Sequence, residues 1–146
     1  NQYLCYLIKD IIFMRDNKLT SQVKELLLQA QNAAQRAYVP YSHFKVGAAL
    51  LLSDGTVSLG CNVENASYGA TMCAERVAVF AACAAGKLSP QQPPQILAVT
   101  ALPCALCLQV LAEFAEPTLS IWVAGADGEQ PQHFLLQDLL PYTFKL

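Results

Sequence analysis

Two short stretches of the chain carry residues whose types and spacing suit metal chemistry. The first is Cys73-Ala74-Glu75, and the second, about thirty residues later, is Pro103-Cys104-Ala105-Leu106-Cys107. Two cysteines separated by two residues at a helix start can bind one cation together. A third thiolate from another helix would complete three protein ligands and leave the fourth tetrahedral position open. An open position admits water, so the pattern predicts a zinc site that is able to catalyse a reaction.

Glu75, the last residue of the first stretch, and Arg76, which directly follows it, suit the same chemistry. A carboxylate two residues from a ligand can accept the proton of the metal's water and deliver it to a substrate nitrogen. Three thiolates would raise the pKa of that water, so we expect Arg76 and the N-termini of two helices to compensate with positive charge. Each signal alone is weak, because a lone C-x-x-C is commonly structural or redox-active and a lone Glu near a helix start is commonly solvated. Together they favour catalysis.

The N-terminal half of the chain predicts one helix and one hairpin. An amphipathic pattern begins at Thr20 or Ser21 and stops before Pro40, which indicates a helix. Two β-rich segments, 46–52 and 57–63, flank an Asp-Gly turn and predict a β-hairpin.

The C-terminal half predicts helices that alternate with strands. One helix over 72–85 would carry Cys73 and Glu75 in its first turn. A second helix would run from Cys104 to about Phe114, with Pro103 at its first position. The remaining expected elements are strands at 96–102 and 119–125 and a short closing helix at 134–140. Strands joined through helices imply a layered α/β domain whose later strands run parallel.

Composition limits the classes of function. Hydrophobic residues make up 54% of the 146 residues and charged residues 14%, as expected for one compact domain, which we assign to residues 20–146. The formal net charge is −2 without a cluster of Lys or Arg, so we expect no nucleic acid partner. Residues 1–19 are interpreted as an extension or leader of unknown role, interrupted by Lys9 and Asp10 and too short for a membrane span, so no membrane partner is expected. The six cysteines fit a reducing cytoplasm better than a disulfide scaffold.

The chain resembles the small, homotetrameric cytidine deaminases. The resemblance runs from about Ser21 to Phe144 and rests on four blocks: VPYSHFKVGAALL, GCNVENASYG, CAERVAVFAA and PCALCLQVLAEF. It implies a three-layer α/β fold with a mixed sheet and helices on both faces. It also implies one zinc ion per chain, held by Cys73, Cys104 and Cys107 in the Cys-ligand variant of the zinc-deaminase signature. Zinc-bound hydroxide would attack C4 of the cytosine ring while Glu75 shuttles protons, which converts cytidine or 2'-deoxycytidine to the uridine product and ammonia.

The same resemblance implies which residues contact the nucleoside. Asn62 and Glu64 would hold the ribose hydroxyls, and Phe44 would pack against the base. Ala66, Tyr68 and Ala74 match the remaining substrate contacts, with Tyr68 reaching into a neighbouring subunit's site. Active sites shared in this way would make a homotetramer necessary for activity. His43 and His133 do not lie at ligand spacing from a cysteine and are interpreted as loop or surface residues.

The sequence departs from the family pattern at the paired cysteines. The family usually has Gly-Ala between them and Arg directly after them, where this chain has Ala105-Leu106 and Leu108. In the family that Arg helps to neutralise the thiolates, so its absence leaves Arg76 as the nearby cation.

Two other functions remain open. The chain could deaminate another small aminated heterocycle, such as a nucleoside antibiotic, although a sugar-binding pair at Asn62 and Glu64 argues for a nucleoside. It could also be a catalytically impaired zinc-binding homologue that has lost turnover together with the family Arg.

Overall fold

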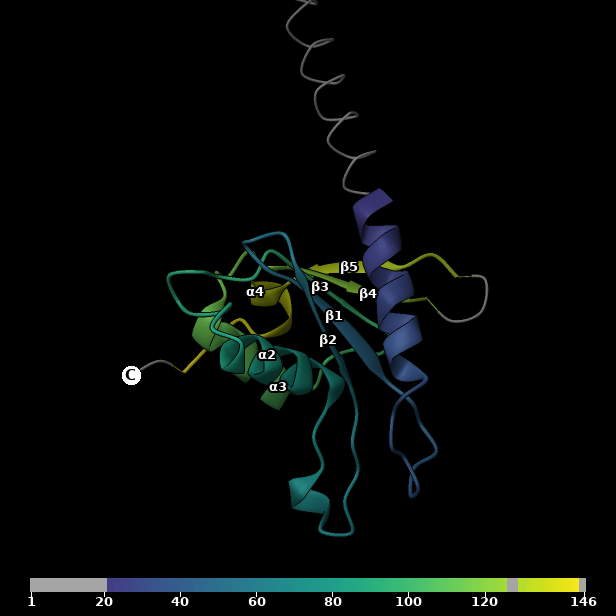
Figure 1. Cartoon of the computed structure of the whole chain (residues 1–146). Helices are drawn as coiled ribbons and strands as arrows, with labels where there is room; N and C mark the ends of the chain where they lie inside the picture. The colour runs from purple at the N-terminus through teal and green to yellow at the C-terminus, as the bar shows by residue number, and fades with distance from the viewer. Residues whose placement is uncertain (1–20, 126–128, 145–146) are drawn as a thin grey trace, which may run out of the picture.

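The computed structural model describes residues 21–125 and 129–144. A five-stranded sheet forms the centre of the domain, with helices on each side of it (Figure 1). The strands are β1 (Gly47–Leu51), β2 (Val57–Cys61), β3 (Ile96–Val99), β4 (Ser120–Val123) and β5 (Gln132–Leu135). The helices are an N-terminal one over 21–34, the 3-10 turn η1 (Tyr68–Ala70), α2 (Ala74–Ala84), α3 (Ala105–Phe114) and α4 (Leu136–Leu139).

The sheet is mixed, in the order β2-β1-β3-β4-β5. β1 and β2 form the antiparallel hairpin predicted around the Asp-Gly turn, and β1 also pairs antiparallel with β3. β3 and β4 run parallel and are connected through α3, whereas β5 returns antiparallel to β4. Two parallel strands need such a crossover because the end of the first strand and the start of the second lie at opposite ends of the sheet.

Alternating side chains of the central strands fill two separate cores. On one face of the sheet, Leu50 and Leu97 pack in a cluster with the buried sides of α2, α3 and α4. On the other face, Leu51 and Ile96 pack against the helix over 21–34. Both faces are covered because each central strand is apolar on both sides, which is the pattern of a sheet between two helical layers. The predicted three-layer α/β architecture is confirmed.

The element boundaries differ from the predictions in several places. The structure adds β5 (Gln132–Leu135), so the predicted closing helix shortens to α4 (Leu136–Leu139). The backbone N–H of Leu135 donates to Oδ2 of Asp138 at 3.0 Å, which marks a strand that passes directly into a helix. The predicted extension over 1–19 lies outside the described residues. Within the described part, no helix is long and apolar enough to cross a membrane.

Two glycines in the hairpin let helices lie unusually close to the sheet. A Cβ on Gly60 would overlap the carbonyl oxygen of Ala74 and would lie 2.6 Å from the nitrogen of Ala78. A Cβ on Gly47 would meet Ala30 and Ala34 of the N-terminal helix in the same way, on the opposite face of the sheet. Only a residue without a side chain permits such an approach. Gly60 therefore sets the height of the first turn of α2 above the sheet.

Candidate metal centre and active site

Three cysteines meet where the N-termini of α2 and α3 come together. Cys73 is the N-cap residue of α2 and Cys104 that of α3, both with extended backbone and neither with a side-chain capping hydrogen bond. Cys107 lies in the first turn of α3 and is fully buried. The prediction that Cys73 lies in the first helical turn and Pro103 at the first helical position is wrong by one to two residues. The helices begin later because both cysteines adopt the extended conformation of a cap.

The spacing of the three sulfur atoms suits one tetrahedral zinc ion. All three Sγ atoms lie within 4.8 Å of one another, and those of Cys104 and Cys107 are 3.4 Å apart. A Zn–S bond of about 2.3 Å in tetrahedral geometry places sulfur ligands about 3.8 Å apart. Thiolates are ligands that zinc prefers, and three of them leave one coordination position for a further group. The donor set therefore fits the predicted zinc ion.

The pKa values of the two thiols on the α3 side are shifted in opposite directions, that of Cys107 upward and that of Cys104 downward. Burial raises the pKa of Cys107, and the nearby carboxylate of Glu75 raises it further. Burial also acts to raise the pKa of Cys104, but hydrogen bonds from Cys107 and from the backbone of Leu106 outweigh it and lower that pKa. Zinc binds cysteine as thiolate, so the backbone groups at the start of α3 favour the form that a metal requires.

Arg76 extends from α2 back to the first of these sulfurs. Its Nη2 donates to Sγ of Cys73 at 3.5 Å and to the carbonyl oxygen of Thr71 at 3.3 Å. The contact with Cys73 raises the pKa of the guanidinium, which therefore remains charged beside the thiol. Nε of Arg76 is buried and has no hydrogen-bond partner among the described residues. The geometry agrees with the predicted electrostatic role of Arg76, although that role itself stays a prediction.

Glu75 is the buried charged side chain of the described core, with 4% of its surface exposed. Burial raises the pKa of its carboxyl group above the ordinary value of 4.5, while Arg76 and Cys107 act against this shift. A raised pKa favours the protonated form of a carboxyl group, which is the form that can donate a proton to a substrate. Position and environment both suit a proton carrier.

A cavity of about 180 Å³ opens beside these groups. Six residues predicted for the site line it: Phe44, Asn62, Cys73, Ala74, Glu75 and Cys104. Four further lining residues were not predicted: Val46, Thr71, Ala101 and Leu102. Nothing in the chemistry of these four side chains signals a site, because the paths of three loops, those before β1, α2 and α3, bring them to the cavity. This cavity is referred to below as the metal-side pocket.

Asn62 holds the wall of the metal-side pocket together. Its Oδ1 accepts a hydrogen bond from the backbone N–H of Val46 at 2.8 Å, and its Nδ2 donates to the carbonyl oxygen of Phe44 at 2.8 Å. A side-chain amide has two donors and two lone pairs, so one donor and one lone pair are left for a ligand. Asn62 is therefore both a structural brace and a candidate ligand contact.

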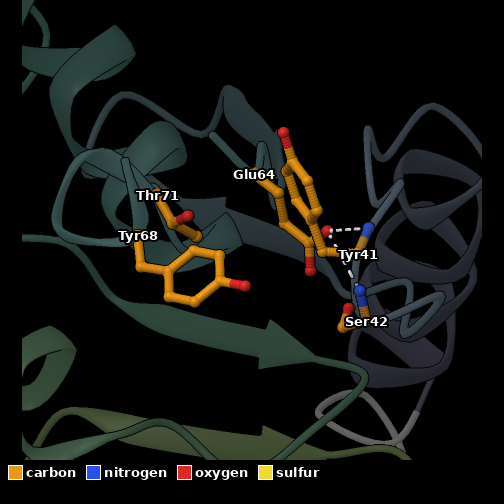
Figure 2. Close-up of a pocket in the computed structure, with 5 residues that line it drawn as sticks. All are labelled: Tyr41, Ser42, Glu64, Tyr68 and Thr71. Atoms are coloured by element: carbon orange, nitrogen blue, oxygen red, sulfur yellow. Dashed lines mark hydrogen bonds between the residues drawn. The ribbon is translucent and has the colours of Figure 1, made fainter. Parts of the chain in front are cut away.

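A second, more open pocket of about 430 Å³ adjoins the first, since Thr71 lines both. Figure 2 shows Thr71 and Tyr68 on one side of it and Tyr41, Ser42 and Glu64 on the other. Oε2 of Glu64 accepts hydrogen bonds from the backbone N–H groups of Tyr41 at 2.9 Å and Ser42 at 3.2 Å, the dashed lines of the figure. The rings of Tyr41 and Tyr68 pack edge to face, with 6.1 Å between the ring centroids.

The two pockets account for most of the predicted contacts but not for all of them. Glu64 and Tyr68 line the open pocket, separate from the lining of the metal-side pocket. Ala66 is exposed and lines neither pocket; Arg76 also lines neither, and it contacts the sulfur of Cys73. The ligand contacts assigned to Glu64, Ala66 and Tyr68 stay predictions, as does the electrostatic role of Arg76.

Comparisons with known proteins agree with this geometry. Residues 20–123 match the family model described as the cytidine and deoxycytidylate deaminase zinc-binding region. The chain is 41% identical over 128 residues to a cytidine deaminase of Sporosarcina psychrophila, with 84% of this chain and 90% of that protein covered. It is 44% identical over 119 residues to a cytidine deaminase of Mycobacterium tuberculosis, with 80% and 85% covered.

Solved structures give the same result. The 1.6 Å crystal structure of cytidine deaminase from Burkholderia pseudomallei superposes with a TM-score of 0.76 at 43% sequence identity, covering 83% of this chain and 98% of that one. The matched region contains both cysteine motifs, so the zinc ligands predicted from the sequence lie within the matched family domain. The chain belongs to the zinc-dependent cytidine and deoxycytidylate deaminase family.

Proposed function

We propose that this chain hydrolyses cytidine and 2'-deoxycytidine to uridine and 2'-deoxyuridine with release of ammonia, as its relatives' names imply. The observation that carries the proposal is the position of Glu75, buried in a pocket wall beside three cysteines whose sulfurs lie within 4.8 Å of one another. One water is consumed and one ammonia leaves, so the ring amine is exchanged for a carbonyl oxygen.

The chain's own residues supply the binding of the metal and the movement of protons. Cys73, Cys104 and Cys107 would hold zinc, which when bound acts as a Lewis acid that activates water at neutral pH. Glu75 would accept one proton from that water and donate it to N3 of the ring. It would then take the second proton from the new C4 hydroxyl group, as the carbonyl forms, and deliver it to the leaving amine. The raised pKa of Glu75 supports this role, because a carboxyl group whose pKa is shifted upward holds its proton more readily than an ordinary one.

The pocket walls suit a pyrimidine nucleoside. Phe44 offers an aromatic face for the base, and Ala74 at the start of α2 leaves room for the flat ring. The remaining hydrogen-bonding groups of Asn62 and Glu64 match sugar hydroxyls, since an amide and a carboxylate provide one donor and several acceptors. Ala66 and Tyr68 would complete the contacts.

We propose in addition that the active form is a homotetramer whose sites are shared between subunits. Large apolar side chains that are more than two-fifths exposed in the single chain support this: Tyr41, Phe44, Leu59, Tyr68, Phe80, Leu102 and Leu106 are among them. Tyr68 is 78% exposed and borders the open pocket, where a second subunit would cover it. Light scattering gives the mass in solution. Activity that falls on dilution, and falls further in Tyr68→Ala, is the expected result.

Three clustered thiols bind zinc only when they are reduced, which supports a reducing compartment such as the cytoplasm. We assign the deaminase domain to residues 20–146. The formal net charge of −2, without a cluster of Lys or Arg, supports a free nucleoside over a polynucleotide as substrate.

The test is a deamination assay on protein whose zinc content has been measured, with cytidine, 2'-deoxycytidine and a panel of aminated heterocycles. Glu75→Gln, assayed beside the wild type, should bind zinc normally but lose turnover by roughly 10²- to 10⁴-fold. A Glu75→Gln protein with full activity would refute the proton-shuttle assignment. Turnover of another heterocycle without turnover of either nucleoside would favour the first alternative function. Full zinc occupancy with no turnover would favour an impaired homologue.

A further inference from the structure

Phe44 lines the metal-side pocket from a loop, and both its backbone N–H and its backbone carbonyl oxygen are hydrogen-bonded to side chains. Oγ of Ser42 accepts a hydrogen bond from the N–H of Phe44 at 3.0 Å, and Nδ2 of Asn62 donates to its carbonyl oxygen at 2.8 Å. Phe44 as a residue is 61% exposed. An exposed ring has few packing contacts that define its position, so its direction depends on the backbone that carries it.

His43, directly before Phe44, is the one non-glycine residue with positive φ in the described part of the chain, at φ 56°. This left-handed conformation is unfavourable for residues with a side chain, and least so for Asn, Asp and His. The side chain of His43 is exposed, so core packing does not explain the conformation. Strained residues of this kind persist where the surrounding structure holds them, commonly next to functional sites.

Several hydrogen bonds hold the loop in this form. The N–H of His43 donates to the carbonyl oxygen of Val39 at 3.1 Å, which closes the turn. Glu64 accepts from the two preceding N–H groups, those of Tyr41 and Ser42. The turn at His43 therefore reverses the chain between a segment held by Glu64 and a segment held by Asn62.

We propose that His43 is a positioning residue for the reaction: its left-handed backbone turns the chain so that the ring of Phe44 faces the metal-side pocket before substrate arrives. This inference rests on the proposed function, because it assumes that Phe44 contacts the base. A ring that is positioned in advance loses little conformational entropy on binding, which favours affinity.

The test compares three replacements of His43 that all remove the imidazole. Asn and Gly accept the left-handed conformation, whereas Val, branched at Cβ, does not. His43→Val should therefore raise the KM for cytidine roughly 5- to 30-fold, because the competent loop becomes a minor conformer. His43→Asn and His43→Gly should have a KM several-fold below that of His43→Val. Because stacking on the base contributes equally before and during the reaction, kcat should change less than KM.

A double-mutant cycle separates positioning from general damage. In a Phe44→Ala background, His43→Val should have little further effect on KM, since its action passes through the ring. Ser42→Ala, which removes the acceptor for the N–H of Phe44, should raise KM as well, while Ser53→Ala in the hairpin turn should not. Zinc content and Tm are measured for each variant, and a variant that has lost zinc is compared at equal metal occupancy.

The outcomes distinguish failure of the positioning role of His43 from failure of the proposed function. Equal KM values for the Val, Asn and Gly variants, or additive effects of His43→Val and Phe44→Ala, would overturn the positioning role while the wild type still deaminates cytidine. A zinc-loaded wild type without cytidine turnover would overturn the proposed function and this inference with it.

Discussion

Gly60→Ala would test whether the close approach of α2 to the sheet positions the metal centre. The added Cβ would overlap the carbonyl oxygen of Ala74 and lie 2.6 Å from the nitrogen of Ala78. Ordinary contact requires about 3.4 Å or more, so the first turn of α2 would have to rise by roughly 1 Å. That turn carries Glu75 and adjoins Cys73.

The magnitudes follow from this displacement. Overpacking of a close contact costs about 1–3 kcal/mol of the free energy of unfolding, which corresponds to roughly 3–10 °C in Tm for a domain of this size. A misplacement of about 1 Å at a reacting group can lower turnover by about 10²-fold. We therefore expect Gly60→Ala to lose both stability and activity, and to bind zinc more weakly.

Gly47→Ala provides the matched control. Its Cβ would meet Ala30 and Ala34 on the opposite face of the sheet, so the N-terminal helix would be displaced rather than α2. The expected loss of Tm is similar, but zinc affinity and kcat should stay much closer to those of the wild type. Differential scanning calorimetry, metal titration and cytidine kinetics measure the three quantities. If Gly60→Ala and Gly47→Ala lose activity equally, or if Gly60→Ala keeps the Tm and kcat of the wild type, the reasoning is wrong.

Three further predictions concern charge and metal. A hydrogen bond with Ser42, together with backbone N–H groups, holds the pKa of Glu64 below the ordinary 4.5. Because the pKa is lower in the folded state than in the unfolded state, the ionised carboxylate of Glu64 stabilises the fold above pH 4.5. This stabilisation is lost as the pH falls through the folded-state pKa. The Tm of the wild type should thus fall more steeply below pH 4.5 than that of Glu64→Gln, and parallel acid limbs would contradict this. Arg76→Leu removes the guanidinium that contacts the sulfur of Cys73 and should lower zinc affinity or kcat by about 10- to 100-fold. Metal titration and cytidine kinetics measure these two quantities. Unchanged values for both would show that the guanidinium is dispensable. Removal of the metal by a chelator should abolish turnover and lower Tm, and added zinc should restore both. Activity that survives complete metal removal, verified by elemental analysis, would rule out a catalytic role for the metal.

The metal ligands could be predicted from the sequence because residues that bind metal occur at short, recognisable spacings. Two thiols three residues apart and a third beside an acidic residue leave few interpretations other than a metal site. The structure confirms the grouping of Cys73, Cys104 and Cys107. Thr71, which lines both pockets, has no such signal, because its place depends on how the loop before α2 folds back: Met72 pairs with Val63, beyond the end of β2.

β5 was missed for a related reason. Edge strands are paired on one side only, and Gln132 and His133 are exposed, so the segment lacks the apolar pattern of a buried strand. The strand also passes into α4 at Leu136 without a turn residue between them. The antiparallel pairing with β4 decides the conformation, and that pairing is not visible in the local sequence. The left-handed backbone of His43 was equally hidden, since histidine carries no turn signal of its own.

The 3.4 Å between the sulfurs of Cys104 and Cys107 has a practical consequence for anyone handling this protein. A disulfide requires about 2.05 Å between the sulfurs, so a small rotation would join these two once the metal is gone. Dissolved oxygen would then convert the pair to an oxidised form that no longer takes up zinc. Buffers that contain a reductant should keep depleted samples recoverable, whereas preparations left in air should lose the capacity for reconstitution with time.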